Sequence, residues 1–110
     1  MDTAKLEFFR GTLDVLILKA LVWGPLHGYA ITNLLRRQSD HALLLEEGTL
    51  YPALLRLQQR RLISAKWAIS DNNRRARYYS LTTAGRKQLT TETESWERMV
   101  GIIGRLLHES

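Results

Sequence analysis

The sequence has no cysteine and only two prolines among its 110 residues. Without cysteine there is no disulfide framework and no thiolate nucleophile, which fits a reducing compartment. No apolar run approaches the roughly 20 residues that a membrane-spanning helix needs. The first ten residues lack the charged, apolar and small-residue regions of a signal peptide. We therefore expect a cytoplasmic protein that does not associate with membranes.

Patterns typical of catalytic or metal sites are also missing. The histidines His27, His41 and His108 are widely separated and show no metal-ligand spacing. There is no GxSxG motif and no glycine-rich phosphate loop. The pair Glu46-Glu47 is better explained as a helix start than as acid–base machinery. We expect no catalytic residue, no metal site and no cofactor, so an enzyme is a remote alternative.

Positive charge is concentrated in one short segment. Residues 1–59 hold six basic and six acidic side chains, and residues 78–110 hold four of each. Residues 60–77 hold six basic side chains and one acidic, which accounts for the whole net charge of +5. A charge run is usually a solvated surface, but one this uneven is typical of a surface that binds a polyanion.

Apolar residues recur at helical spacing in three segments before this basic region. We expect a first helix after Thr12, acting as its N-cap, and a stop at Gly24-Pro25. A second helix should run from about His27-Gly28 to Arg37. A third should open near Gly48-Thr49, with a buried face that contains Leu50, Leu54 and Leu57.

The apolar period then changes from helical to alternating. Ile63, Ala65, Trp67 and Ile69 alternate with smaller or polar residues, which predicts a strand with one buried face. The following SDNNRR segment is a turn signal, because Asn and Asp tolerate positive φ. A second strand over residues 76–81 completes the prediction of a hairpin with a basic tip.

A last helix is expected from a cap at Thr82 or Thr83 to about Leu107. Its heptad-spaced stripe begins at Leu89, passes through a polar Thr93 and continues at Trp96, Val100, Ile103 and Leu107. About 25 residues span some 37 Å, longer than so small a domain can cover. An exposed apolar stripe marks an interface, and a two-fold dimer is the simplest partner. Gly101 and Gly104 weaken this helix intrinsically.

The order of elements predicts a mainly α fold with a two-stranded β-wing. It is a winged helix-turn-helix over residues 1–81, followed by a long C-terminal dimerisation helix over residues 82–110. The third helix and the hairpin would face double-stranded DNA, with bases read by the helix and phosphates bound by the wing. The candidate DNA contacts are Thr49, Tyr51, Arg56, Arg60, Lys66, Asn72, Asn73, Arg74, Arg75 and Arg77.

Plainer interpretations stand beside these. From periodicity alone, the third helix is equally well an ordinary surface helix, and the basic tip is otherwise a solubilising loop. A winged-helix module that binds an acidic protein, with no direct DNA role, is the alternative function. For Trp96, packing in an interface is the favoured interpretation. The alternative is an effector pocket in which its ring stacks on a planar ligand.

Five segments resemble the PadR family of bacterial transcription regulators, over about residues 8–107. They are GTLDVLILKAL, HGYAI, EEGTLYPALLRLQQRRLI, DNNRRARYYSLTTAGR and the Trp-containing helix that follows. GTLYPAL followed at this distance by RRARYYSLTTAGR is specific in combination. The single short C-terminal helix resembles the smaller subgroup of the family.

The resemblance implies a homodimeric repressor of a neighbouring transporter or stress operon, bound to an inverted-repeat operator. It implies release from DNA by a small aromatic or lipophilic effector. Thr49 and Tyr51 match the family's DNA-contact motif, and Arg74, Arg75 and Arg77 match its basic wing. In the family the C-terminal helix dimerises with help from the first helix, which adds Leu13 to the expected interface. Trp96 matches an aromatic residue of some small members, which makes it the candidate effector contact.

Overall fold

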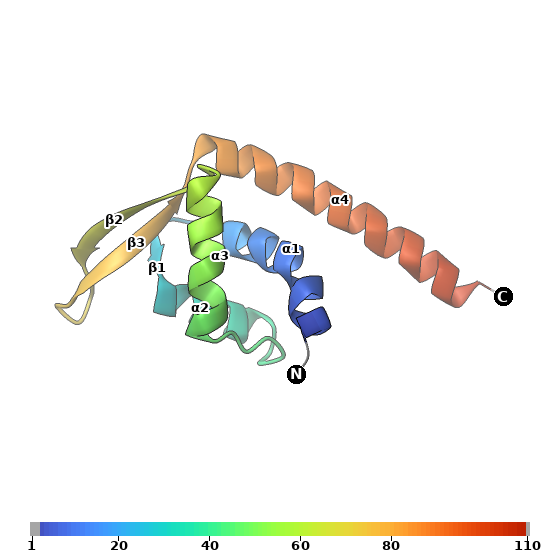
Figure 1. Cartoon of the computed structure of the whole chain (residues 1–110), viewed down its shortest axis with the longest axis horizontal. Coiled ribbons are helices and arrows are strands. Elements are labelled where there is room, and N and C mark those ends of the chain that lie inside the picture. Colours follow the sequence, from blue (N-terminus) through green and yellow to red (C-terminus); the bar gives the residue numbers. More distant parts are fainter. Residues whose placement is uncertain (1–2, 110) are drawn as a thin grey trace.

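Over residues 3–109, four helices and a small antiparallel sheet make up the fold (Figure 1). The computed structural model describes the backbone of residues 3–109 and the side chains of residues 11–109. The elements in chain order are α1 (Thr3–Ala20), β1 (Leu26–His27), α2 (Gly28–Gln38), α3 (Glu47–Gln59), β2 (Ile63–Ile69), β3 (Arg75–Leu81) and α4 (Thr83–His108). The prediction of a mainly helical winged-helix fold with a long last helix is confirmed.

Helix α1 begins earlier than the sequence indicated. It starts at Thr3, so Thr12 lies inside the helix and the prediction of an N-cap there is wrong. Residues 4–10 read AKLEFFR, in which Ala, Leu, Glu, Lys and Arg are good helix formers and nothing stops a helix. The buried face of α1 contributes Leu13, Ile17, Leu18 and Ala20 to the core.

Helices α2 and α3 form the helix-turn-helix and begin close to their expected positions. His27 caps α2, because its Nδ1 accepts a hydrogen bond from the Ala30 amide at 3.2 Å. Glu46 and Glu47 open α3, as expected for the acidic pair. The predicted face of α3 is confirmed, since Leu50, Leu54 and Leu57 are fully buried.

The sheet has one strand more than predicted. Its order is β1-β3-β2, and β1 pairs Leu26 with Tyr79 and His27 with Tyr78. A strand of two residues is too short to show an alternating pattern, so it could not be predicted from the apolar period.

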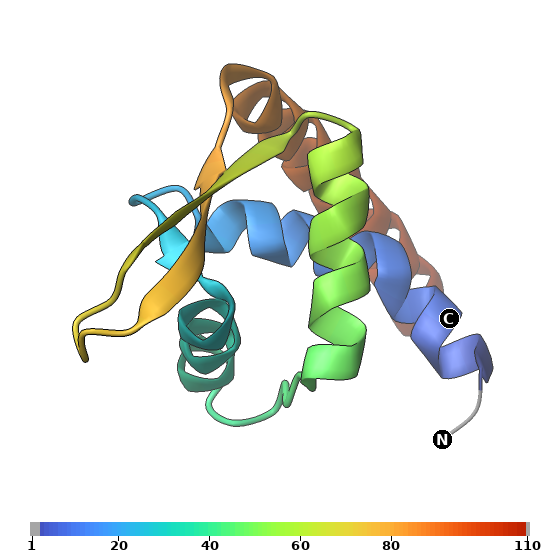
Figure 2. The same cartoon turned by 60° about the vertical axis from the view of Figure 1, so that its left-hand side comes forward.

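Strands β2 and β3 form the hairpin that we call the wing, residues 63–81, and it extends beyond the helical body (Figure 2). Ile63 is buried and Ala65 half-buried, but Trp67 and Ile69 are 53 % and 65 % exposed. The prediction that all four share a buried face is therefore wrong for the outer half of β2, because no helix lies there to cover them. The turn is confirmed, with Asn73 at a φ of 61°.

Helix α4 is anchored at its first turn and then leaves the body. The Thr82 hydroxyl accepts from the Gly85 amide at 2.9 Å and donates to the carbonyl oxygens of Arg61 and Leu62. The helix continues through Gly101 and Gly104 without a break. Its free end points away from the wing, in a molecule that measures 58 × 31 × 24 Å (Figure 1). None of the described helices is apolar enough over a sufficient length to cross a membrane.

Candidate nucleic-acid interface

The first turns of α2 and α3 are brought together by a contact between Tyr51 and Gly28. Tyr51 lies in the first half of α3, and its side chain is 45 % exposed. Its hydroxyl lies 2.7 Å from the position that a Cβ atom on Gly28 would occupy. A glycine at the start of α2 therefore lets the hydroxyl end of the Tyr51 side chain approach that helix terminus closely. Thr49, two residues before Tyr51 in the same helix, is half-buried.

The inner face of the wing carries two arginines and a tryptophan. Cross-strand pairing sets Trp67 opposite Arg77 and Ile69 opposite Arg75, so all four side chains leave the same face of the hairpin. The guanidinium carbons of Arg75 and Arg77 lie 4.9 Å and 5.8 Å from the centroid of the Trp67 ring. Both distances are within the range of a cation–π interaction.

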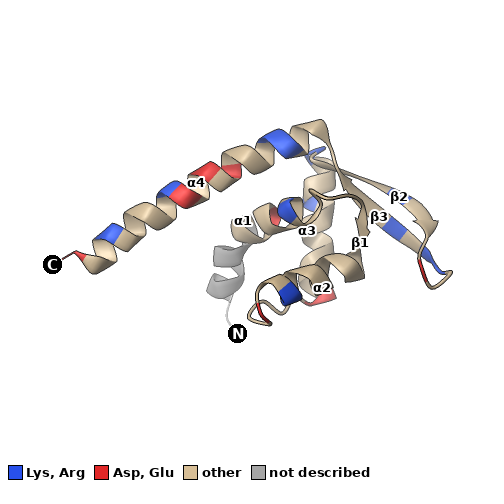
Figure 3. Ribbon diagram, turned by 180° about the vertical axis from the view of Figure 1, so that it is seen from behind, with Lys and Arg blue, Asp and Glu red and all other residues tan. Residues whose placement is uncertain are grey.

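The tip of the wing is ordered by its own hydrogen bonds. The Ser70 amide donates to the Arg74 carbonyl at 2.7 Å, and the Ser70 hydroxyl donates to the same oxygen at 2.9 Å. The Asn73 amide donates to the Ser70 carbonyl at 2.9 Å. Asn72, Asn73 and Arg74 are exposed at this tip. Basic residues mark both strands and the turn of the wing in Figure 3.

A cleft of 510 Å³, which we call the wing cleft, separates the wing from the helix-turn-helix. Its walls come from the start of α2, the first half of α3 and the inner face of the wing. The side chains that line it include His27, Tyr29, Tyr51, Trp67, Arg75 and Arg77. None of the described residues that line it is acidic. The arrangement is a positively charged, aromatic-walled groove open to solvent.

Tyr79 forms the buried floor next to this cleft. Burial raises the pKa of the Tyr79 hydroxyl above its usual value of 10.0, the positive charge of Arg77 lowers it and Tyr51 raises it. Burial has the largest effect, so the hydroxyl stays neutral and Arg77 keeps its charge free for an anion.

Three predicted DNA contacts lie apart from the wing cleft. Lys66 pairs with Tyr78 and leaves the opposite face of the hairpin. Arg60 caps the C-terminal end of α3, the far end from Tyr51. The Arg56 side chain is 33 % exposed and its guanidinium donates to the Asp14 carboxylate of α1 at 2.8 Å, so its contact with DNA stays a prediction. This arginine joins two helices.

A second exposed feature is the apolar stripe of α4. We use that name for Trp96, Val100, Ile103 and Leu107, which are 38 %, 51 %, 46 % and 74 % exposed. Met99, Ile102 and Leu106 widen it on one side. Leu89, at its start, is half-buried against the core. Leu13 does not belong to this surface: it is only 5 % exposed and packs inside the core, so its predicted role in a dimer interface is wrong.

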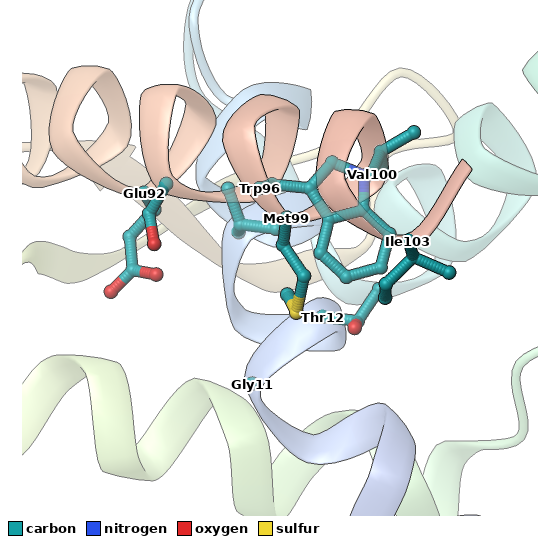
Figure 4. Close-up of a pocket in the computed structure, with 9 residues that line it drawn as sticks. Gly11, Thr12, Glu92, Trp96, Met99, Val100 and Ile103 are labelled. Carbon is teal, nitrogen blue, oxygen red and sulfur yellow. The ribbon is translucent and has the colours of Figure 1, made fainter. Parts of the chain in front are cut away.

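Trp96 stands between two apolar pockets that α4 forms with α1. One pocket, of 360 Å³, lies towards Val100 and Ile103, and the Met99 side chain points from α4 to the turn of α1 that holds Gly11 and Thr12 (Figure 4). The other, of 560 Å³, lies towards Leu89 and Leu16. Both pockets are open, so part of the stripe already covers α1 while much of it faces solvent. Within the described chain, no three His, Asp or Glu side chains gather to hold a metal ion.

Comparison with known proteins decides the class of this protein. The family model described as the Transcriptional regulator PadR-like family matches residues 17–91. The chain belongs to this family. The recognised PadR-like segment runs from the last turn of α1 into α4, so it includes the wing cleft and the first part of the α4 helix.

Individual transcriptional regulators are similar to this protein along almost the entire chain. Transcriptional regulator Rv3488 of Mycobacterium tuberculosis is 33 % identical over 93 residues, which cover 84 % of this chain and 83 % of that protein. A transcriptional regulator from Clostridium thermocellum superposes with a TM-score of 0.81 at 30 % identity, covering 90 % of this chain and 96 % of that one. A PadR family regulator from Eggerthella lenta gives 0.80 at 31 % identity, with 98 % and 92 % covered. These proteins are transcriptional regulators and not enzymes, and DNA-binding regulation is the function class of the family.

Several residues of the wing cleft could not be recognised from the sequence. Tyr29 lies in the HGYAI segment but carried no signal of its own, and His27 was interpreted only as a helix start. Trp67 was assigned to a buried face. Only the register of the hairpin could have indicated this site. Once the length of the turn is known, the register pairs Trp67 with Arg77 and places both side chains on one face.

Proposed function

We propose that this protein is a homodimeric repressor that binds an inverted-repeat operator through the wing cleft and its borders. The observation that carries the proposal is the meeting of Tyr51, Arg75 and Arg77 around one acid-free groove. Residues 1–81 would form the DNA-binding domain and residues 82–110 the dimerisation helix. Because such a regulator works at the chromosome, the proposal puts the protein in the bacterial cytoplasm.

Two groups of side chains would divide the work on DNA. Tyr51 and Thr49, near the start of α3, would approach base edges in the major groove, as the second helix of a helix-turn-helix does. Arg74, Arg75 and Arg77, with Asn72 and Asn73 at the tip, would bind phosphates beside the groove. Lys66 and Arg60 lie on neighbouring surfaces, where they would add only long-range attraction.

Salt-dependent binding tests this assignment. The affinity of the full chain for a duplex taken from upstream of its own gene should fall steeply with salt, by about 0.9 in log K per log unit for each phosphate neutralised. Arg75→Ala with Arg77→Ala should weaken binding to every sequence and reduce that slope by about 2. Arg98→Ala with Arg105→Ala removes the same charge from α4 and serves as the control. An unchanged slope in the wing variant would remove the wing from the interface.

Release by an effector is the second part of the proposal. The two pockets beside Trp96 present mainly apolar surface, which suits a small aromatic or lipophilic molecule. Planar compounds should quench tryptophan fluorescence and lower the affinity for the operator. Trp23 and Trp67 also contribute to the fluorescence, so the Trp96→Ala variant is the necessary control. A broad panel that changes neither signal would contradict this part alone.

A further inference from the structure

Trp67 is an exposed tryptophan that neither the core nor the α4 surface explains. More than half of its surface is accessible, at 53 %. It lies on the outer half of β2, where no helix covers the sheet (Figure 2). Large apolar side chains at such positions usually serve an interaction. Its neighbours on the same face are the two arginines, Arg75 and Arg77.

The contacts of Trp67 restrict both arginines before any ligand arrives. Arg77 lies directly across the ladder from Trp67, and Arg75 lies diagonally across it, with guanidinium carbons 5.8 Å and 4.9 Å from the ring centroid. An arginine otherwise loses rotamer entropy when it is fixed. A cation–π contact holds it near one orientation in advance, so less of that entropy is lost on binding.

In the orientation that the tryptophan holds, both arginine side chains face the wing cleft. Trp67, Arg75 and Arg77 line that cleft together with Tyr51 of α3. No described acidic residue lines the cleft, so neither guanidinium is neutralised there. A ligand that enters meets two held positive charges on one side and a tyrosine hydroxyl on the other. A sugar–phosphate strand of duplex DNA matches this combination of charge and hydrogen-bond donors.

We propose that Trp67 is a positioning residue of the DNA interface: its indole ring holds Arg75 and Arg77 over the wing cleft, where they bind one phosphate backbone beside the groove that Tyr51 enters. The inference rests on the DNA-binding surface proposed above. It predicts that the aromatic ring, and not the apolar bulk of the side chain, matters for affinity. It also predicts that the effect of Trp67 passes entirely through the two arginines.

Anisotropy titrations of a labelled upstream duplex at several salt concentrations test this role. Trp67→Leu should weaken binding about three- to ten-fold and lower the salt slope, because the arginines lose their stacking surface. Trp67→Phe keeps a ring and should stay within about two-fold of the original. Ile69→Ala, on the same strand and face, removes apolar surface without a ring and should leave the slope unchanged. Thermal unfolding of each variant establishes that the fold is kept.

Combined variants distinguish a failure of the positioning role from a failure of the proposed DNA surface. Adding Trp67→Leu to Arg75→Ala with Arg77→Ala should have no further effect on affinity. A further loss in that background would mean that Trp67 touches DNA itself, which would overturn the positioning role. If the arginine variant weakens binding but Trp67→Leu does not, the positioning role alone is wrong. If the arginine variant has no effect, the DNA surface proposed above is wrong as well.

Discussion

Gly28 shows how a single residue can set the geometry of a binding surface without touching the ligand. It lies at the first position of α2, and a Cβ atom there would come within 2.7 Å of the Tyr51 hydroxyl and 3.1 Å of the carbon that bears it. Real Cβ atoms do not approach so closely, so Tyr51 would have to move. The obstacle is the far end of a side chain and not backbone, and so the fold can accommodate the change.

We therefore expect Gly28→Ala to alter DNA binding more than stability. Alanine is favoured over glycine in a helix by up to about 1 kcal/mol, which offsets the strain at Tyr51. The melting temperature should change little, while operator affinity should fall by about ten-fold or less, as for one displaced contact. Tyr51→Phe removes the hydroxyl, so Gly28→Ala should cause little additional loss in a Tyr51→Phe background. An equal loss in both backgrounds would contradict the mechanism.

Tyr79 gives a pH dependence of stability that can be assigned to one side chain. Burial holds the pKa of its hydroxyl above 10.0 in the folded state, whereas the unfolded chain ionises near that value. Above that pH the unfolded state binds fewer protons than the folded state, so the free energy of unfolding falls as pH rises. Denaturant titrations between about pH 8 and pH 11 should show this fall, and Tyr79→Phe should make it shallower. Identical pH profiles for both proteins would contradict the assignment.

The junction between the wing and α4 is tightly packed at Gly85. A Cβ atom on Gly85 would lie 2.0 Å from the Leu62 carbonyl oxygen, which is backbone and cannot move aside. The Thr82 hydroxyl reaches the same carbonyl from the helix cap. This junction fixes the direction in which α4 leaves the body, and with it the position of any partner bound to α4.

Gly85→Ala should consequently destabilise the protein by about 3 kcal/mol, at the upper end of the range for overpacking. Gly101→Ala is the matched control, because it lies in the same helix with nothing within 4 Å of the added atom. That variant should be neutral or slightly stabilising. Thermal and denaturant unfolding measure both. Equal stabilities for the two variants would mean that the start of α4 can shift away from Leu62.

Elements were predictable from the sequence where the signal is local. Helices α2 and α4 follow from periodicity and from caps that lie beside them, at His27 and Thr82. What could not be predicted depended on contacts distant in sequence. The ion pair of Arg56 is one case, because its partner Asp14 lies 42 positions away. The exposure of Trp67 depends on how far the wing extends past the helices, which no alternating pattern records.

The candidate site divides in the same way. Arg75 and Arg77 stood out because charge is visible in composition, and Tyr51 because its motif resembles a family pattern. The wing cleft itself could not be predicted, since it is formed by α2, α3 and the wing together. Leu13 shows the opposite error. An expectation that came from the resemblance placed it at an interface, whereas helical packing buries it in the core of one chain.

At the scale of the whole molecule, the wing and the apolar stripe of α4 lie at opposite ends (Figure 1). This separation lets one surface bind a partner while the other binds DNA. A two-fold axis along α4 would present two wing clefts, and half-sites on one face of DNA lie roughly 34 Å apart. The two pockets beside Trp96 would then border the dimer contact, so a ligand there would change the spacing of the two clefts.

The prediction of a dimer can be wrong even if the prediction of DNA contact is right, and the mass in solution tests it directly. The full chain should sediment at twice its mass of 12.7 kDa. Val100→Asp with Ile103→Asp places charge in the apolar stripe and should give a 12.7 kDa monomer. The monomer should bind an inverted repeat about 100-fold more weakly, because the second half-site no longer adds to the first. Helical spacing places Arg98 and Arg105 on the opposite face, so Arg98→Asp with Arg105→Asp should stay dimeric. A wild-type mass of 12.7 kDa would exclude the dimer. Dissociation of both variants would show that the net charge of α4, and not its apolar stripe, decides whether the two protomers associate.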